Sequence, residues 1–307
     1  MSYLFKKIIQ RIRLGISKDL QNLKFLLGQN SVLTSRSMSG KFINLWDAEV
    51  KVFSQWGEDG ILDFICEKIG LTKPRVLEIG AGNFTECNSR FLVENRNASV
   101  VLVDGRKDLV LNVNSSSLKW KTHIFALEEW VTTKNINEII RSAKNKVNNV
   151  DIFSIDLDGN DYWIVEAADL HEIQVIVVEY NPLFGSDFAV SVPSDDYFNR
   201  ATKHHSCLYY GASLRAFNHI LNQKGFIFIG SNRVGNNGFF VRQEIVGKIN
   251  LPVPNDLSLY TDWRIRESRD SSGKLNYISG SDRLEEIKDL PLKDVVNRID
   301  IKVIDII

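Results

Sequence analysis

The chain has 307 residues, 44% of them hydrophobic, and its 38 lysines and arginines balance 38 aspartates and glutamates. This composition excludes a wholly disordered chain, which would bury too little apolar surface. It also argues against a nucleic-acid partner, because such binders usually carry excess positive charge. The three cysteines form no CxxC pair, which argues against a disulfide framework or a structural zinc site and is typical of the cytoplasm. No apolar run approaches the roughly 20 residues that span a bilayer, so we expect a soluble cytoplasmic protein.

Residues 1–50 are expected to form a basic amphipathic helix followed by a linker. Residues 1–28 contain six basic side chains against one acidic one, and their apolar residues recur at helical spacing: Phe5, Ile9, Ile12, Ile16 and Leu20. Such a stripe usually packs on the main domain, which is the interpretation we favour. The alternative is a peripheral contact of residues 1–28 with an anionic membrane surface. The glycines and serines of the stretch 28–40 predict the linker.

Residues 51–249 alternate between strand and helix patterns and predict one α/β domain. Apolar strands are expected at 75–80, 99–105, 122–127, 151–158 and 175–180, with helices at 84–95, 135–146 and 161–168. Continuous Val, Ile and Leu runs indicate strands that are covered by helices on both faces. This repetition predicts a parallel, doubly wound, Rossmann-like sheet.

The end of the domain departs from this repetition. A helix is expected at 213–224, followed by strands at 226–230 and 238–242 that are separated by a short turn rich in Gly and Asn. So short a connection predicts an antiparallel hairpin, which completes a seven-stranded sheet with five parallel strands. Residues 250–307 are a more polar extension that we expect to act as a lid over the site or as a dimer contact.

A cofactor site is predicted at the ends of the first two strands. Gly80 and Gly82 follow the first strand in the string Glu78-Ile-Gly-Ala-Gly, where glycine lets the backbone turn tightly and approach a ligand. Asp104 ends the second strand, where an acid can accept hydrogen bonds from both ribose hydroxyls. Together they predict a nucleoside-containing cofactor at the topological switch point. Thr85 stands where the dinucleotide fingerprint has its third glycine, which disfavours nicotinamide.

A second set of polar residues follows the next two strands: Asp156, Asp158, Asn160, Asp161, Glu179 and Asn181. Three interpretations compete. Asp156 or Asp158 acts as the general base toward an acceptor hydroxyl. Alternatively, Asp156, Asp158, Glu179 and Asn181 provide oxygen ligands for Mg²⁺. In the third interpretation, the acids merely cap the following helix.

The segment 181–211 is a long loop, of a kind that is usually functional in a compact domain. It contains the adjacent pair His204 and His205. His204 is an alternative general base, because a histidine titrates near neutral pH. The competing interpretation is that both histidines are solvated loop residues.

These motifs resemble the class I S-adenosylmethionine-dependent methyltransferases. Within that class, Ser154–Gly159 (SIDLDG) followed by Val177-Val178-Glu179 is similar to the FkbM-type pattern, although Asp158 stands where that pattern usually has glutamate. The resemblance implies O-methylation of a small-molecule or saccharide acceptor. It also implies that Glu78, Gly80 and Gly82 line the methionine part of the cofactor. Asp104 would then hold the ribose, Leu127 would lie near the adenine, and Asp156 would lie beside the methyl group.

Two other functions remain open at this point. A nucleotide-dependent oxidoreductase or epimerase would use the same strand ends, with Thr85 as the main objection. A catalytically inactive, methyltransferase-like scaffold would bind a partner without turnover. The sequence does not decide between these functions, because function depends on the site rather than on the fold.

Overall fold

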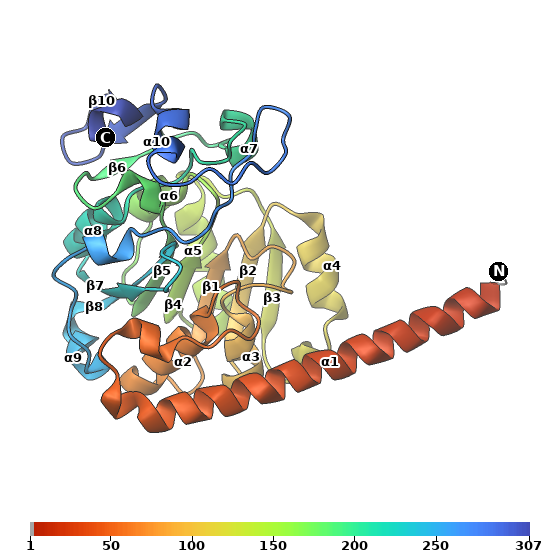
Figure 1. Cartoon of the computed structure of the whole chain (residues 1–307). Coiled ribbons are helices and arrows are strands. Elements are labelled where there is room, and N and C mark those ends of the chain that lie inside the picture. Colours follow the sequence, from red (N-terminus) through yellow and green to blue (C-terminus); the bar gives the residue numbers. More distant parts are fainter. Residues whose placement is uncertain (1–2) are drawn as a thin grey trace.

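The computed structural model describes the backbone of residues 3–307 and the side chains of residues 19–307. A seven-stranded sheet forms its centre, with the strand order β3-β2-β1-β4-β5-β8-β7 (Figure 1). The strands are β1 (Arg75–Ile79), β2 (Ser99–Asp104), β3 (Ile124–Glu128), β4 (Ile152–Ile155), β5 (Val175–Glu179), β7 (Phe226–Ser231) and β8 (Asn237–Arg242). Strands β1 to β5 pair in parallel. Strand β8 pairs antiparallel with both β5 and β7. The doubly wound sheet with a closing hairpin is therefore confirmed.

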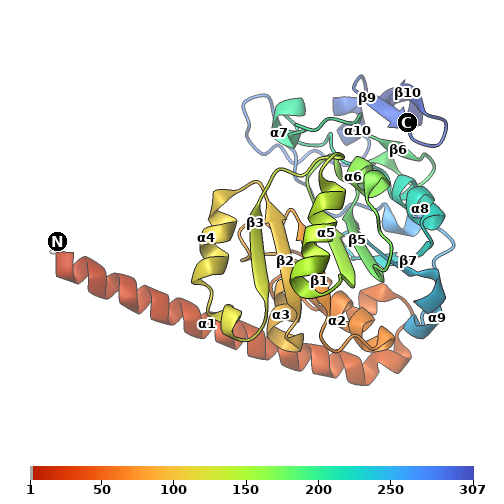
Figure 2. The ribbon, with the colours of Figure 1, turned by 180° about the vertical axis from the view of Figure 1, so that it is seen from behind.

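Helices cover both faces of this sheet, as predicted. One face carries α5 (Ile136–Val147), α6 (Asp161–Ala167) and α8 (Leu214–Gln223), seen in front in Figure 2. The other face carries α2 (Glu58–Ile69), α3 (Arg90–Arg96), α4 (Lys107–Ser115) and α9 (Val246–Ile249). Successive strand residues point to opposite faces, so the apolar side chains of β1 and β2 contribute to the hydrophobic cores on both faces of the sheet. The strand order changes direction at β1 and β4, which places a ligand site at their carboxyl ends.

The expected helix at 84–95 begins only at Arg90. Phe84 has a left-handed backbone with φ +67°, which interrupts a right-handed helix. The carboxylate of Glu78 accepts hydrogen bonds from the backbone N–H groups of Asn88 and Ser89 at 2.7 and 3.0 Å. The buried carboxylate of Glu78 thus stabilises a loop between β1 and α3.

The expected linker at 28–40 is also wrong, because helix α1 runs continuously from Tyr3 to Met38. Gly28 is a contact point inside this helix, since a Cβ there would lie 2.3 Å from a methyl group of Val52. Val32 is buried together with Val52, Phe53 and Phe91. Packing of this helix against the domain outweighs the weak helix propensity of its glycine and serines.

The long loop and the C-terminal extension fold together. Strands β6 (Val190–Ser191), β9 (Pro291–Asp294) and β10 (Ile299–Lys302) form a second, antiparallel sheet. Helices α7 (Arg200–Lys203) and α10 (Asp282–Ile287) complete this layer, which lies at the opposite end of the molecule from α1 (Figures 1 and 2). Within the described residues, no helix combines the length and apolarity needed to cross a membrane.

Candidate functional site

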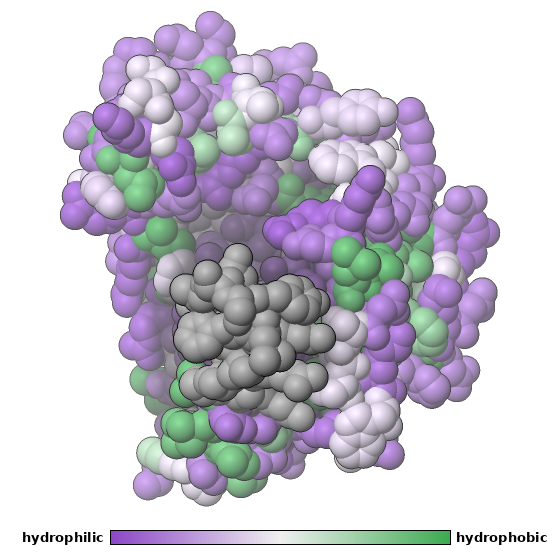
Figure 3. All heavy atoms as spheres, turned by 90° about the vertical axis from the view of Figure 1, so that its right-hand side faces the viewer, coloured by the Kyte–Doolittle hydropathy of each residue, from purple (hydrophilic) through white to green (hydrophobic). Residues whose placement is uncertain are grey.

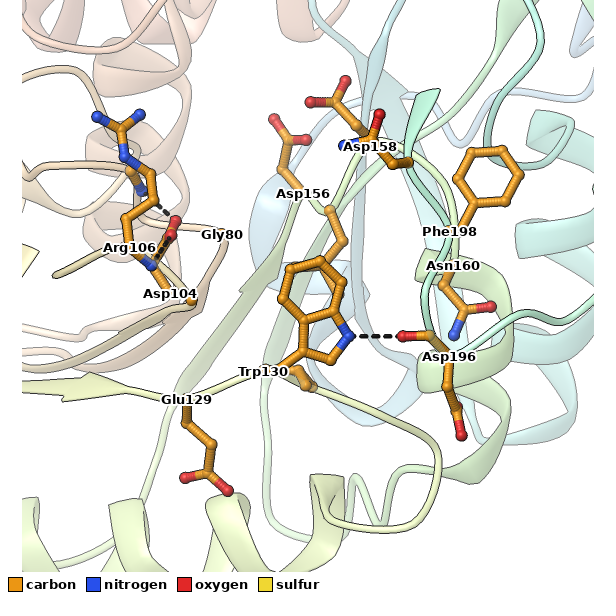
Figure 4. Close-up of a pocket in the computed structure, with 15 residues that line it drawn as sticks. Gly80, Asp104, Arg106, Glu129, Trp130, Asp156, Asp158, Asn160, Asp196 and Phe198 are labelled. Atoms are coloured by element: carbon orange, nitrogen blue, oxygen red, sulfur yellow. Dashed lines mark hydrogen bonds between the residues drawn. The ribbon is translucent and has the colours of Figure 1, made fainter. Parts of the chain in front are cut away.

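A cavity of about 470 Å³ lies at the carboxyl ends of β1 to β4 (Figure 4). Its volume is in the range of small-molecule and cofactor sites. Each of the four strands contributes to its lining, and the loop between β5 and α8 closes one side. The lining residues are Gly80, Gly82, Asp104, Gly105, Arg106, Glu129, Trp130, Val131, Asp156, Leu157, Asp158, Asn160, Asp196, Phe198 and Asn199.

The glycine loop owes its shape to close backbone packing. A Cβ on Gly80 would lie 1.6 Å from the carbonyl oxygen of Asp156, and the residue has φ +78°. Only glycine fits at this point, where β1 and β4 end side by side. Gly82 also has a positive φ, of +58°, but a Cβ there would meet open space. Its N–H instead donates a hydrogen bond of 2.8 Å to the carboxylate of Asp104.

The carboxylate of Asp104 is fixed at the edge of the cavity. One oxygen accepts the Gly82 N–H, and the other accepts the backbone N–H of Arg106 at 2.9 Å. Figure 4 shows this side chain beside Gly80 and across the cavity from Phe198. A carboxylate held in this way keeps lone pairs free toward the cavity, which suits it to accept hydrogen bonds from a bound ligand's hydroxyl groups.

Two residues expected at the cofactor lie behind the lining rather than in it. Glu78 is buried, which raises its pKa, and its carboxylate accepts hydrogen bonds from the backbone N–H groups of residues 88 and 89. Leu127 packs partly buried against the hydrophobic core. The third strand reaches the cavity through Glu129, Trp130 and Val131 instead. The strand-end pattern that singled out Asp104 would have found them directly after the end of β3 at Glu128.

Trp130 ties the sheet to the long loop. Its indole N–H donates to the backbone carbonyl of Asp196, a contact drawn as a dashed line in Figure 4. Phe198 presses on Gly159 so closely that a Cβ on this glycine would lie 2.0 Å from the ring. This hydrogen bond and this packed ring help to hold the loop over the cavity, and neither has a sequence signal of its own.

Asp156, Asp158 and Glu179 form an acidic cluster, with one oxygen of each lying within 4.8 Å of the others. Burial, followed by the charges of Asp158 and Asp161, raises the pKa of Asp156 to about 8. Burial and the charge of Asp156 raise the pKa of Glu179 well above its ordinary value. One oxygen of Glu179 is buried without a hydrogen-bond partner. Carboxyl groups this close resist simultaneous ionisation, so the cluster retains a proton at neutral pH.

Arg200 of α7 supplies positive charge to this cluster. Its guanidinium donates a hydrogen bond of 3.0 Å to Asp158 and lies 4.0 Å from the ring centre of Tyr210. Its side chain is only 17% exposed, whereas that of Asp158 is 60% exposed. The charge of Arg200 also acts on Glu179, where it favours the ionised carboxylate. Sequence reasoning missed this residue, because only the folded loop brings it back to β4.

The capping interpretation is wrong, because the N-cap residue of α6, Asn160, makes no side-chain cap hydrogen bond and the bonded acid, Asp161, accepts from the loop before the helix. The Asp161 carboxylate accepts hydrogen bonds from the N–H groups of Leu157 and Gly159 at 2.7 and 2.9 Å. Its pKa is raised to about 6 by burial. Asp156 and Asp158, by contrast, line the cavity (Figure 4).

Asn181, expected as a metal ligand, lies outside the acidic cluster. Its side-chain oxygen accepts the N–H of Leu183, and its amide donates to the carbonyls of Leu208 and Tyr210 at 3.0 Å. Both ends of this buried side chain are thus used to fix the start of the long loop. The structure brings together three of the four expected ligands, all of them carboxylates.

His204 does not reach the cavity either. Its Nδ1 lies 2.8 Å from the hydroxyl of Ser206, and its ring centre lies 4.3 Å from that of His205, with the two planes tilted by 36°. His205 in turn pairs with Glu286 of α10 at 3.0 Å. The two histidines therefore join the long loop to the C-terminal extension and stand apart from Asp156.

A second cavity, of about 500 Å³, adjoins the first. The two share Trp130, Leu157, Asp158, Phe198 and Asn199. The second cavity adds Arg200, Ala201 and Cys207 from the long loop, and Glu267 and Arg269 from the C-terminal extension. The extension thus contributes to a cavity, while its expected role as a dimer contact stays a prediction.

No family model matches the sequence, and neither does any curated protein. The solved structures that resemble this chain include an S-adenosylmethionine-dependent methyltransferase from Clostridium acetobutylicum. It is 11% identical, the match covers 59% of this chain and 89% of that one, and the TM-score is 0.37. TrmK from M. capricolum, in complex with S-adenosylhomocysteine, is 12% identical over 67% of this chain and 76% of its own, with a TM-score of 0.34.

A putative sarcosine dimethylglycine methyltransferase from Galdieria sulphuraria is also similar. It is 12% identical over 56% of this chain, with a TM-score of 0.34. The match spans 62% of that protein, less than two thirds of its length. These activities belong to the proteins so named, whereas the fold of the present chain follows from its own strand order, that of a seven-stranded Rossmann-like sheet.

Proposed function

We propose that this protein binds S-adenosylmethionine in the 470 Å³ cavity and transfers its methyl group to an acceptor oxygen. One observation carries the proposal: Gly80, the carboxylate of Asp104 and the raised-pKa carboxyl of Asp156 line a single cavity at the topological switch point. This arrangement combines a close backbone approach, an acceptor for ribose hydroxyls and a proton-accepting group.

The charge of the lining favours a cationic cofactor over a dinucleotide. Five of the lining residues are acidic, and Arg106 is the one basic residue among them. A dinucleotide brings a negatively charged pyrophosphate, which is best bound at a helix N-terminus directly after the glycine loop. Here α3 begins ten residues after Gly80, at Arg90. A sulfonium cation is stabilised by the same acids that would repel a pyrophosphate.

In this proposal Asp156 is the general base. S-adenosylmethionine supplies an electrophilic methyl group whose bond to sulfur breaks with the electron pair staying on sulfur. Asp156 takes the proton of the acceptor hydroxyl as the oxygen bonds to the methyl carbon. A carboxylate whose pKa is raised to about 8 is a stronger base than an ordinary aspartate, once it is ionised. The FkbM-type resemblance of residues 154–159 and 177–179 supports oxygen as the accepting atom.

The adjoining 500 Å³ cavity is the proposed acceptor site. It shares Asp158 with the cofactor cavity, so an acceptor there lies beside the acidic cluster. Trp130 and Phe198 offer aromatic surface, and Asn199 and Arg200 offer hydrogen-bond donors. Such a lining suits a small molecule or a saccharide hydroxyl.

The donor set fits Mg²⁺ only in part. Asp156, Asp158 and Glu179 could reach one ion, but Asn181 is committed elsewhere and Arg200 already provides positive charge at Asp158. A cation and a guanidinium at the same carboxylate would repel each other. We therefore derive no step through a metal, and turnover in the presence of a chelator tests this choice.

The test is a calorimetric titration of the purified protein with S-adenosylmethionine, S-adenosylhomocysteine and NAD⁺. We expect both adenosyl ligands to bind and NAD⁺ not to bind. Asp104→Ala should weaken the two adenosyl ligands by at least about tenfold, because hydrogen bonds to a charged group contribute ~1.5–3 kcal/mol. The exposed Asp262→Ala, whose side chain is 79% exposed and lies outside the lining, is the matched control.

Two results would overturn the proposal. Binding of NAD⁺ alone would make the site a nicotinamide site. Binding of the adenosyl ligands without turnover on a broad panel of hydroxyl acceptors would contradict the catalytic part and leave a binding scaffold.

A further inference from the structure

Helix α1 presents two different faces along its described half. One face packs on the domain: Phe25 meets the ring of Phe91 with centroids 6.0 Å apart, and Val32 is buried. Gln29 and Arg36 add hydrogen bonds to α3 and α2, at Asn95 and Asp63. These contacts attach this face of α1 to the domain.

The opposite face carries an apolar stripe that is largely exposed. Leu20, Leu23 and Leu27 are 60%, 53% and 60% exposed. Val32 follows Leu23 by nine residues, which at about 100° per residue is a rotation of about two and a half turns. The two side chains therefore point in opposite directions. Of the stripe that was expected to pack on the domain, Leu20 points away from it, whereas Phe5, Ile9, Ile12 and Ile16 lie outside the residues whose side chains are described.

The sequence continues this stripe toward the N-terminus. Phe5, Ile9, Ile12 and Ile16 precede Leu20 at the same spacing of three and four residues. Their side chains lie outside the described part, but α1 is continuous from Tyr3, so their positions fall on the same helix face as Leu20. From residue 5 to residue 27 the stripe is about 33 Å long.

The charge of this segment identifies the kind of surface that covers the stripe. Residues 1–28 carry six basic residues and one acidic residue, in a chain whose total charge is zero. Two copies meeting along this stripe would bring like charges together, which disfavours a self-association. An anionic lipid surface accepts both the apolar stripe and the basic residues of this segment, of which Lys6 and Arg13 fall beside the stripe at about 100° per residue. We propose that α1 binds an anionic membrane surface through Leu20, Leu23, Leu27 and the preceding apolar positions.

The position of α1 is compatible with activity on a membrane. It lies at the end of the molecule opposite α7 and the second sheet (Figures 1 and 2), and α7 contributes Arg200 to the second cavity. Figure 3, which faces the N-terminal end of α1, shows hydrophobic surface along the lower edge of the molecule next to the grey residues. A bound membrane would thus leave the candidate site open. The inference does not depend on the proposed function.

The experiment is flotation of the full-length protein with two kinds of vesicle, one of phosphatidylcholine and one of phosphatidylcholine mixed with phosphatidylglycerol. We expect binding to the mixed vesicles, weaker binding at high salt, and little binding to phosphatidylcholine alone. Replacing Lys6, Lys7, Arg11 and Arg13 by Gln should reduce partitioning by about a hundredfold or more, since each basic residue contributes about fivefold.

The apolar part is tested by the triple variant Leu20→Ser, Leu23→Ser and Leu27→Ser. We expect a loss of about tenfold or more on the mixed vesicles, with unchanged thermal unfolding, because these side chains are exposed. Leu111→Ser and Leu259→Ser are the matched controls, since these leucines are 69% and 63% exposed and lie outside α1.

The proposal is overturned if the protein does not float with mixed vesicles, or if the triple variant floats as well as the parent. Light scattering after gel filtration provides a further check. A dimer that forms without vesicles and dissociates in the triple variant would make a second copy the occupant of the stripe.

Discussion

Asp156→Asn should stabilise the folded protein at alkaline pH while abolishing turnover. Asn keeps the size of the side chain and removes its charge. The ordinary pKa of an aspartate, 3.8, rises at Asp156 to about 8, mainly through burial. Such a group binds its proton more tightly in the folded state than in the unfolded state. Its ionisation therefore lowers stability progressively as the pH rises from about 4 to about 8, and it has no effect below both values.

The magnitude follows from the two pKa values. The span from 3.8 to about 8, at about 1.4 kcal/mol per pH unit, gives an upper limit of about 6 kcal/mol. Part of this penalty passes to Glu179, which titrates together with Asp156, and part is relieved because the carboxyl of Asp156 reaches the cavity. We expect a gain of ~2 kcal/mol for Asp156→Asn above pH 8, which raises the unfolding temperature by about 4–8 °C in a domain of this size.

The assay is urea or thermal unfolding of the parent and the variant at acidic, neutral and alkaline pH. The difference in free energy of unfolding should be close to zero near pH 4 and should grow until about pH 8. Asp262→Asn is the control, because its side chain is 79% exposed. A difference that does not change with pH, or a variant less stable than the parent at alkaline pH, would refute the argument from burial.

Three further substitutions test the cavity. Gly80→Ala should lower the free energy of unfolding, measured in urea, by about 3 kcal/mol or more, because its Cβ would collide with the Asp156 carbonyl. Gly82→Ala should lower it by only about 1 kcal/mol, because of the positive φ at that position. Equal costs would contradict the close packing of β1 on β4. The rate of methyl transfer should rise with pH as the proposed base, Asp156, ionises. Arg200→Gln should move the midpoint of this rise to higher pH, because losing the cation favours the protonated forms of the carboxyl cluster. An unchanged midpoint would exclude Arg200 as the counter-charge of this cluster.

The sheet could be predicted from the sequence because its signals are local. The strands are continuous apolar runs bounded by glycines or acids, and the short turn between β7 and β8 permits only an antiparallel hairpin. That Gly80, Gly82, Asp104 and Asp156 line one cavity could be predicted for a related reason. They end parallel strands, and all such ends meet at one edge of a doubly wound sheet.

Contacts between segments that lie far apart in the chain could not be predicted from the sequence. Arg200 reaches Asp158 across 42 residues, and Trp130 reaches Asp196 across 66, so neither pair has a spacing that local pattern reading detects. Asn181 had the right chemistry for a ligand, but the folded loop spends its side chain on backbone groups.

The same distinction applies to α1. Its amphipathic stripe and basic charge were evident from the spacing of residues 1–28. Which face of the helix packs on the domain was decided only by the tertiary structure, where Gly28 and Val32 fit against Val52 and the leucines are left outside. Periodicity determines that a helix has an apolar face, whereas the complementary surface of the fold determines whether that face is buried.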